Sequence, residues 1–426
     1  MINKSLFALL LIANTISFAQ DQNVFLTRRY WSNNPSIEQV EKEIKNGADP
    51  SALDKYQFDA VSWAILEKTS NKTILHLLSK KGNEVNKLTH DGRTYIFWAA
   101  YKNNLELMNH LIKHGAKTDI IDQHGYSLVN FCAVTGQINT EIYDFCIANG
   151  ANLKKEKNKL GANPLLLLMP FIKEIKLIDY FTSKGLNIKS TDNEGNNAFN
   201  YACKTGNKLI ISYLLKKGIS PISNDHNAII FAAQGTRKTK NNISFFHYLD
   251  SLGVRFDAHD QDGQNILHIL SKRSKDTVLM NYLINKRIKL NVKDKNGNTC
   301  FSNAIKRNNI EIIKYFSKKN PESVNYIDNQ GNNIIHLAIQ RKKTDIISLA
   351  INLIPTLINQ KNNDGLTPLH LSCMKAEDEE IIKMLILMGA DIKIKTDFGE
   401  TAFDLAKENE KLIKANSNVE FLKYSK

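Results

Sequence analysis

Glycine recurs along this chain at an almost fixed interval, and that interval constrains the fold more than any other feature. Nine glycines that precede apolar-rich segments are separated by 33, 36, 34, 68, 34, 34, 34 and 34 residues: Gly92, Gly125, Gly161, Gly195, Gly263, Gly297, Gly331, Gly365 and Gly399. The long gap holds one more copy, "DHNAIIFAA", with Asp225 at the glycine position. Such a period predicts stacked supersecondary units in place of separate globular domains.

A second set of glycines follows amphipathic segments such as "LELMNHLIKHGA". Its members are Gly47, Gly82, Gly115, Gly150, Gly185, Gly218, Gly253 and Gly389. Apolar residues three and four apart indicate a helix with one buried face, and a glycine just past its end fits a left-handed C-cap. Each unit is therefore predicted to be a turn, a short helix, a second helix and a glycine stop.

The unit "DGLTPLHLSC" (Asp364–Cys373), with "MGADIKIK" after it, resembles the ankyrin repeat. "DGRTYIFWAA", "DGQNILHILS" and "QGNNIIHLAI" follow the same pattern, although Asn often replaces Thr and the proline is kept only at Pro164 and Pro368. The resemblance implies an all-α, ankyrin-type solenoid of about eleven to twelve helix-turn-helix repeats with short β-hairpin-like tips.

The histidines and threonines of this motif have a structural explanation in that register. Thr367 is placed to cap the N–H groups of a first helix, and Pro368 fits the first helical position. His370, like His268 and His336, is expected to face the turn and to satisfy backbone or hydroxyl groups there. The motif is therefore interpreted as scaffold.

The cysteines also fit the repeat. Five are present, and their number and spacing do not predict a disulfide framework. Cys132, Cys203 and Cys373 fall where other copies have alanine, so buried thiols are expected. A disulfide between Cys132 and Cys146, on the two helices of one repeat, stays open.

Motifs for catalysis are not found. His110 and His114 lie one helical turn apart, so a metal site is an alternative to two solvated histidines, but no H-E-x-x-H motif or third ligand accompanies them. A nucleophile elbow, a phosphate-binding glycine loop and a dinucleotide fingerprint are missing as well. We predict that the protein is no enzyme and needs no cofactor.

The first residues predict export. Residues 1–19 read as a signal peptide, with Lys4, the apolar block "LFALLLIA" and the small residues Ser17 and Ala19 before Gln20. The block is shorter than the roughly 20 residues that span a bilayer. We expect a bacterial protein of the periplasm or the medium, without a transmembrane segment in the mature chain.

The remaining chain divides by its pattern. Residues 20–35 are expected to form an N-terminal linker or capping segment, and residues 36–426 the repeat array, with a C-terminal cap at about 397–426. The repeat near 225–259 is irregular, because its tip is clipped and its inter-helix loop, "GTRKTKNN", is long. Such a loop marks a working face, a bend or a tolerated insertion.

The formal net charge is +14, but only 9 of the 57 basic residues are Arg. Proteins that bind phosphates and base edges rely on Arg, whose planar guanidinium binds bidentately. The expected export also argues against a chromosomal or ribosomal partner. No nucleic-acid partner is therefore expected, although extracellular nucleic acid remains among the ligands of an alternative function.

The resemblance implies binding on the concave surface formed by the tips and the first helices. The candidate partner-binding residues at the first-helix ends are Tyr101, Lys102, Lys204, Lys272, Arg273, Lys306, Arg307, Arg341 and Lys375; we call the last six, from Lys272 on, the basic ladder. They predict an acidic protein partner. The alternative is that these cations only solvate the helix ends and complement the helix dipoles. Three tyrosines of the N-terminal half are expected either to anchor a partner or to belong to the core: Tyr95, Tyr101 and Tyr126.

The resulting prediction is a monomeric, non-enzymatic scaffold that binds a protein in its concave groove. One alternative is an anion-binding module for polysaccharide, lipid headgroups or extracellular nucleic acid. Another is an accessory or protective subunit of a periplasmic enzyme, for example one that handles oxidative stress, as the resemblance to exported bacterial ankyrin-like proteins implies.

Overall fold

The computed structural model describes residues 23–222 and 227–423. The predicted signal peptide and the clipped tip at Asp225 lie outside these ranges. The described residues contain helices and two isolated β-bridges, Thr89–Arg93 and Ile327–Asn333, but no strand. The predicted all-α solenoid is confirmed.

The chain forms two compact units. Unit 1 comprises the described residues up to Ala202 and Asn207–Ser220, and unit 2 comprises Cys203–Gly206 and the described residues from Pro221 onward. The helices of unit 1 are α2 (Arg28–Ser32), α3 (Ile37–Lys45), α4 (Ala60–Leu66), α5 (Asn71–Leu78), α6 (Tyr95–Tyr101), α7 (Leu105–Lys113), α8 (Leu128–Val134), α9 (Thr140–Ala148), α10 (Pro164–Leu168), α11 (Ile175–Ser183), α12 (Ala198–Ala202) and α13 (Lys208–Lys216).

The helices of unit 2 are α15 (Ala228–Gln234), α16 (Ile243–Ser251), α17 (Ile266–Arg273), α18 (Thr277–Asn285), α19 (Cys300–Arg307), α20 (Ile310–Lys319), α21 (Ile334–Ile339), α22 (Thr344–Leu353), α23 (Pro368–Lys375), α24 (Glu380–Leu387), α25 (Ala402–Glu408) and α26 (Glu410–Lys414). Short 3₁₀ turns are η1 (Val24–Leu26), η2 (His90–Gly92), η3 (Met169–Phe171), η4 (Pro321–Asn325), η5 (Pro355–Leu357) and η6 (Glu420–Leu422).

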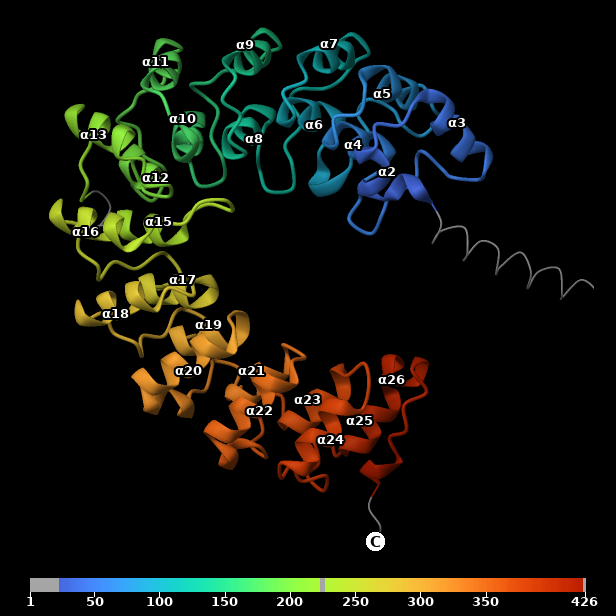
Figure 1. Ribbon diagram of the computed structural model, residues 1–426, viewed down its shortest axis with the longest axis vertical. Helices are drawn as coiled ribbons and strands as arrows, with labels where there is room; N and C mark the ends of the chain where they lie inside the picture. Colours follow the sequence, from blue (N-terminus) through green and yellow to red (C-terminus); the bar gives the residue numbers. More distant parts are fainter. Residues whose placement is uncertain (1–22, 223–226, 424–426) are drawn as a thin grey trace, which may run out of the picture. The chain divides into compact units, whose positions relative to one another are not determined.

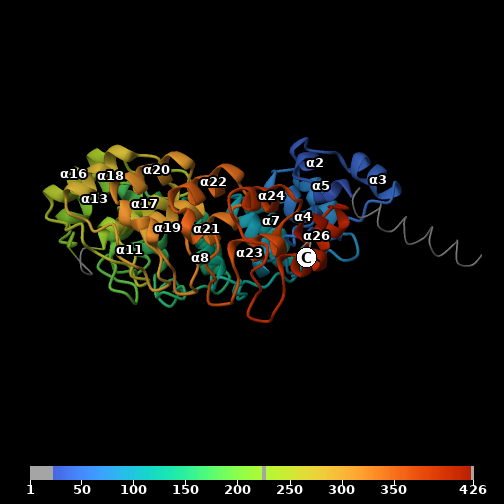
Figure 2. The same cartoon turned by 90° about the horizontal axis from the view of Figure 1, so that it is seen from below.

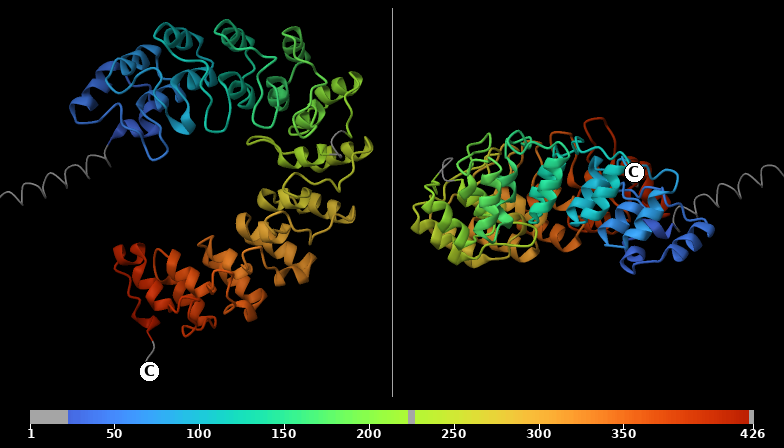
Figure 3. Two further views of the ribbon diagram at one scale, coloured as in Figure 1. Left: turned by 180° about the vertical axis from the view of Figure 1, so that it is seen from behind. Right: turned by 90° about the horizontal axis from the view of Figure 1, so that it is seen from above.

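Within each unit the helices form two rows (Figure 1). In unit 2, for example, α17, α19, α21 and α23 lie side by side as first helices. The second helices, α18, α20, α22 and α24, form the other row, and each contacts the first helix of its own repeat. The loops that precede the first helices, which we call tip loops, project from one edge of the rows (Figures 2 and 3).

First helices are buried almost all round because each packs against the first helices of both neighbouring repeats and against its own second helix. In α6 every residue from Tyr95 to Ala100 is buried. In α7 only Leu107, Met108 and Leu111 are buried, so this second helix has one apolar face. A single repeat cannot bury its own apolar surface, which makes stability a property of neighbouring repeats.

Side-chain caps start most of these helices. The Thr367 hydroxyl accepts the His370 main-chain N–H at the start of α23, and Pro368 occupies the first turn. Because the first N–H groups of a helix have no internal partner, such caps fix where the helix begins.

The tip loops share one hydrogen-bonded turn. The Oδ1 atom of Asp192 accepts the main-chain N–H groups of Glu194 at 3.0 Å and Asn196 at 2.9 Å, and Gly195 between them has φ +83°. The same two-N–H arrangement occurs at Asp54, Asp122, Asn158, Asp260, Asp294, Asp328, Asn362 and Thr396.

Buried histidines join successive repeats, as expected of structural residues. The Nδ1 atom of His370 accepts the Thr367 main-chain N–H at 3.1 Å, and Nε2 donates to the Ile394 carbonyl of the next tip loop at 3.0 Å. His268 and His336 make the same kind of link. Burial lowers the pKa of all three imidazoles.

The position of the second-helix glycine varies in unit 2. Arg287 occupies it with φ +63°, in the left-handed region that favours glycine. Pro321 and Pro355 occupy it in the next two repeats, where they begin η4 and η5. The helix stop is therefore kept by different residues.

The ends and the irregular repeat have their own contacts. In residues 23–35, Phe25 and Trp31 are fully buried, and near the C-terminus Leu412 and Leu422 are buried. The long loop of residues 235–242 joins α15 to α16. Its Asn241 donates to the Cys203 and Ala232 carbonyls, so this loop is tied to neighbouring first-helix ends.

Candidate partner-binding surface

The basic ladder lies in unit 2, at or just after the ends of first helices. Tyr101 and Lys102 end α6 of unit 1, so they belong to a separate compact unit. The surface of unit 2 is therefore described from the ladder alone, and Tyr101 and Lys102 are taken with their own neighbours.

Lys272 and Lys306 extend from the ends of first helices, and each hydrogen-bonds a side chain of the tip loop that precedes its own helix. The Nζ of Lys272 hydrogen-bonds the Gln264 side chain, and that of Lys306 lies 2.6 Å from Asn298 Oδ1. Both acceptors stand at the end of a tip turn, in the same register. The two ammonium groups are thus fixed between first helices and tip loops.

The electrostatics of this pair reflect partial burial. Desolvation lowers the pKa of Lys272 and of Lys306, partly opposed by Asp294. The guanidinium of Arg307 lowers the pKa of both lysines further, which shows that the three cations share one local field. A carboxylate placed among them would relieve that repulsion.

Arg273, Arg307 and Lys375 are exposed. No hydrogen bond or ion pair holds these three side chains within the described part of the chain. The main-chain oxygen of Arg273 accepts a hydrogen bond from Lys240 Nζ at 3.3 Å, so the long loop reaches the same helix end. These cations are available at the rim of the surface.

Arg341 is used differently. Its Nη1 donates to the carbonyls of Ile305 at 3.0 Å and Asn308 at 3.1 Å, which lie at and just past the end of α19. Asn308 in turn donates to the carbonyls of Ser271 and Ser274 at the end of α17. The guanidinium therefore caps the preceding first helix, as in the helix-end alternative.

Lys204 and Lys102 lie against aromatic rings. Lys204 Nζ is 5.0 Å from the ring centroid of Phe231, and Lys102 Nζ is 5.8 Å from that of Tyr101. Desolvation lowers the pKa of both lysines. Their stems cover apolar surface while the ammonium groups stay near an aromatic face.

Unit 1 carries an aromatic row that the sequence analysis missed. Trp63, Trp98 and Phe131 occupy the same register in three successive first helices, nine residues after the first residue of each tip turn. The ring centroids of Trp98 and Phe131 are 5.9 Å apart, and the Arg93 guanidinium lies 4.5 Å from the Phe131 centroid. Aligning the repeats on their tips would have revealed this row.

The tyrosines proposed as anchors have different environments. Tyr95 is fully buried, and its hydroxyl donates to Asp59 at 2.7 Å, so it belongs to the core. Tyr126 is partly buried, whereas Tyr101 is 43% exposed. Tyr101 is the most exposed of the three tyrosines.

The histidine pair is a stack on the surface of α7. The rings of His110 and His114 are 4.0 Å apart between centroids, and His114 Nδ1 donates to the His110 carbonyl. Within residues 23–222 and 227–423, no group of three His, Cys, Asp or Glu side chains is placed to hold a metal ion.

The five thiols are buried and free. The hydrogen bond with Cys146, together with burial, raises the pKa of the Cys132 thiol. None of the described helices combines the length and the apolar character needed to cross a bilayer.

The two rows of short helices, with a capped tip turn before each first helix, define a helical repeat protein. The family model for ankyrin repeats (three copies) matches residues 61–157, 229–326 and 304–396, more than half of the chain. The chain belongs to the ankyrin repeat family, and the predicted resemblance is confirmed. No curated protein matches it. Ankyrin repeats generally mediate protein–protein interaction, and the family is typically non-enzymatic.

Proposed function

We propose that the protein is a non-enzymatic scaffold that binds an acidic protein partner in the groove between the first helices and tip loops of unit 2. The observation that carries this proposal is the group of Lys272, Lys306 and Arg307, whose charges are held together and partly desolvated. Asp294, near both lysines, and Asp328, paired with Lys306, offset part of this positive charge. The exposed Arg307 still attracts a partner carboxylate, and complementary charge speeds encounter.

The exposed arginines provide the test, because their replacement leaves the hydrogen bonds of Lys272 and Lys306 intact. In a pull-down from bacterial envelope extract, the wild-type chain is expected to retain a partner protein that the variant Arg273→Glu/Arg307→Glu does not retain. The matched control is Lys314→Glu/Lys318→Glu, which makes the same change in charge on α20, a second helix, at exposed positions. Equal retention of the partner protein by both variants would contradict binding in the groove.

The salt dependence separates this function from the anion-binding alternative, which the charge of +14 favours. A protein partner held partly by apolar contacts stays bound at moderate salt. Anionic polymers bound through counter-ion release are washed off steeply. Retention of polymers alone would establish the alternative. A stoichiometric complex with one envelope enzyme would instead identify an accessory subunit.

Export to the bacterial periplasm or medium is part of the proposal. The support is the order of charge, apolar block and small residues in residues 1–19. Expression of the full chain in a bacterium, followed by fractionation and N-terminal sequencing, is expected to give periplasmic or secreted protein that begins at Gln20. Cytoplasmic protein that begins at Met1 would contradict it.

A further inference from the structure

Asparagine side chains bridge successive tip loops at two repeat junctions. Asn86 Nδ2 donates to the Gly115 carbonyl at 2.8 Å, and Asn86 Oδ1 accepts the Lys117 main-chain N–H at 2.8 Å. Asn359 makes the same pair of bonds with the Gly389 carbonyl and the Asp391 N–H. A carboxamide can do this because it carries a donor and an acceptor side by side.

Asp257 occupies the same register in unit 2, four residues after the second-helix glycine. Its ionised carboxylate has no N–H, so it cannot donate to the Arg287 carbonyl. Asp257 Oδ1 instead lies 3.5 Å from Arg255 Nε. Among the described residues, neither the Arg287 carbonyl nor the Lys289 main-chain N–H has a hydrogen-bond partner. The bridge is therefore missing at this junction.

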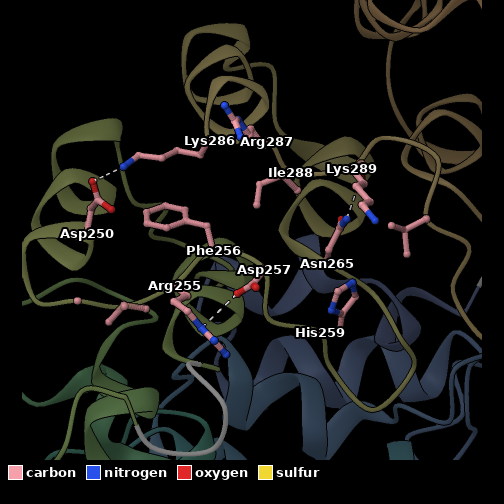
Figure 4. Close-up of a pocket in the computed structure, with 13 residues that line it drawn as sticks. Asp250, Arg255, Phe256, Asp257, His259, Asn265, Lys286, Arg287, Ile288 and Lys289 are labelled. Atoms are coloured by element: carbon pink, nitrogen blue, oxygen red, sulfur yellow. Dashed lines mark hydrogen bonds and ion pairs between the residues drawn. The ribbon is translucent and has the colours of Figure 1, made fainter.

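A cavity of about 730 Å³ opens beside Asp257. Val254, Phe256 and Ile288 are buried and form its apolar floor. Asp257 and His259 also line it (Figure 4). The volume lies within the range of about 300–1,000 Å³ that is typical of ligand sites. A smaller cavity, of about 320 Å³, lies beside Asp119, which replaces the bridging asparagine in unit 1. Both cavities therefore coincide with an aspartate in the bridge position.

The two cavities differ in charge. Four cations, Arg255, Lys286, Arg287 and Lys289, and two carboxylates, Asp250 and Asp257, line the larger one. Lys286 is paired with Asp250 at 2.6 Å, and Arg255 with Asp257, as Figure 4 shows. The Arg287 and Lys289 side chains have no acidic partner in the described structure. The smaller cavity has Asp119 and Glu156 in its lining and no Lys or Arg.

We propose that the cavity beside Asp257 binds an extended acidic segment of a protein partner. One residue of such a segment supplies both missing groups: its main-chain N–H donates to the Arg287 carbonyl, and its carbonyl accepts the Lys289 N–H. This is the bonding pattern of a parallel β-bridge, and it reproduces the asparagine bridge. Alternate side chains then fall on the Phe256 floor and beside the cations of Arg287 and Lys289.

No residue of the basic ladder lines this cavity, so the cavity is a second contact of the proposed partner or an independent one. The probe is a short, blocked, labelled peptide of alternating glutamate and leucine, and its binding to the full-length protein is followed by fluorescence anisotropy. Asp257→Asn is expected to weaken binding about tenfold or more, because the new carboxamide occupies both main-chain groups. Asp257→Ala removes the negative charge without a bridging group and is expected to tighten binding.

These opposite signs make the test sharp, because a purely electrostatic site would respond to both substitutions in the same direction. Asp119→Asn is the matched control, and it leaves the affinity unchanged if the larger cavity is the site. Tighter binding by Asp257→Asn, or equal binding of a lysine–leucine peptide, would overturn the proposal. So would displacement of the peptide by an equal concentration of inorganic phosphate, which would indicate a site for free anions.

Hydrogen exchange gives an independent readout. The peptide is expected to slow exchange of the Lys289 amide in wild-type protein, and unchanged exchange would overturn the proposed bond. The Arg273→Glu/Arg307→Glu variant separates the two surfaces, because it leaves peptide binding intact if the cavity is the site. Loss of peptide binding in that variant would place the peptide in the groove and overturn the cavity proposal alone.

Discussion

The Nε2 atom of His370 donates to the main-chain oxygen of Ile394 in the following tip loop, at 3.0 Å. Since Nδ1 accepts the Thr367 N–H at the same time, the imidazole is held neutral, with its proton on Nε2. Protonation at Nδ1 would remove the acceptor for a buried N–H group. A link between repeats therefore depends on the charge state of one side chain.

Stability is expected to fall in mild acid. Burial lowers the pKa of His268, His336 and His370 in the folded state. As the pH drops through the ordinary value of about 6.5, the unfolded chain therefore takes up protons first. The free energy of unfolding then decreases by at most about 1.4 kcal/mol per pH unit for each histidine, and levels off below the folded-state pKa.

Urea unfolding measured at pH values from neutral down to about 5 gives the dependence of the unfolding free energy on pH. This range covers the region just below the ordinary histidine pKa. His336→Gln is expected to flatten this dependence, because one titrating link is removed. An equal slope in wild type and His336→Gln would refute the role assigned to the buried imidazoles.

Arg341 and Lys375 are predicted to respond differently to truncation, although both belong to the basic ladder. Arg341→Ala leaves the Ile305 and Asn308 carbonyls without their charged donor, and the expected loss is about 2 kcal/mol of unfolding free energy. Lys375→Ala is expected to change stability by less than about 0.5 kcal/mol, because the side chain is exposed. Denaturant titration of both variants measures the two losses of unfolding free energy. Equal losses would show that Arg341 does not cap α19.

The asparagine bridge can be removed and installed. Asn359→Asp is expected to lower the free energy of unfolding by about 1 kcal/mol, because the Gly389 carbonyl loses its donor. Asp257→Asn is expected to raise it by a similar amount by closing the bonds to Arg287 and Lys289. Thermal unfolding of the pair measures both. A change of the same sign in the two variants would argue against a shared bridge.

The backbone at Arg287 is predicted to be under strain. A residue with a side chain loses about 1 kcal/mol at the φ of +63° found there. Arg287→Gly is therefore expected to raise the free energy of unfolding, by an amount reduced by the entropy that glycine adds to the unfolded chain. Gly389→Ala is the converse test, since φ is +105° there and no atom lies within 4 Å of an added Cβ. It should destabilise by about 1 kcal/mol. Calorimetry that shows no loss for Gly389→Ala would exclude the backbone explanation.

The repeat, the caps and the role of the histidines were accessible from sequence, because each depends on local spacing. Thr367, Pro368 and His370 lie within one turn, and their bonds follow from the register. The same argument placed Cys132, Cys203 and Cys373 in the core, where they lie buried, as do the other two cysteines. Local rules repeated along a chain reinforce one another, so the fold followed from them.

The surface was less predictable, because it depends on where long side chains turn. A position at a first-helix end does not tell whether a guanidinium reaches back to a neighbour's carbonyls, as in Arg341, or faces solvent, as in Arg307. The bridge was missed for a related reason. Asp257 and Asn359 differ by one atom type, and the consequence appears only when the next repeat's main chain is in place.

The missing bridge has a mechanical consequence. The repeats of α17 and α19 remain joined by His268 to the Asn298 carbonyl, by Asn308 to the Ser271 carbonyl and by the Lys295 main-chain N–H to the Asp262 carbonyl, so Asp257 leaves this junction one pair of bonds short. Under tension a stack of repeats parts where the fewest bonds must break. A segment seated beside Asp257 would supply the missing pair of bonds, and would therefore raise the force at which the repeats of α17 and α19 part.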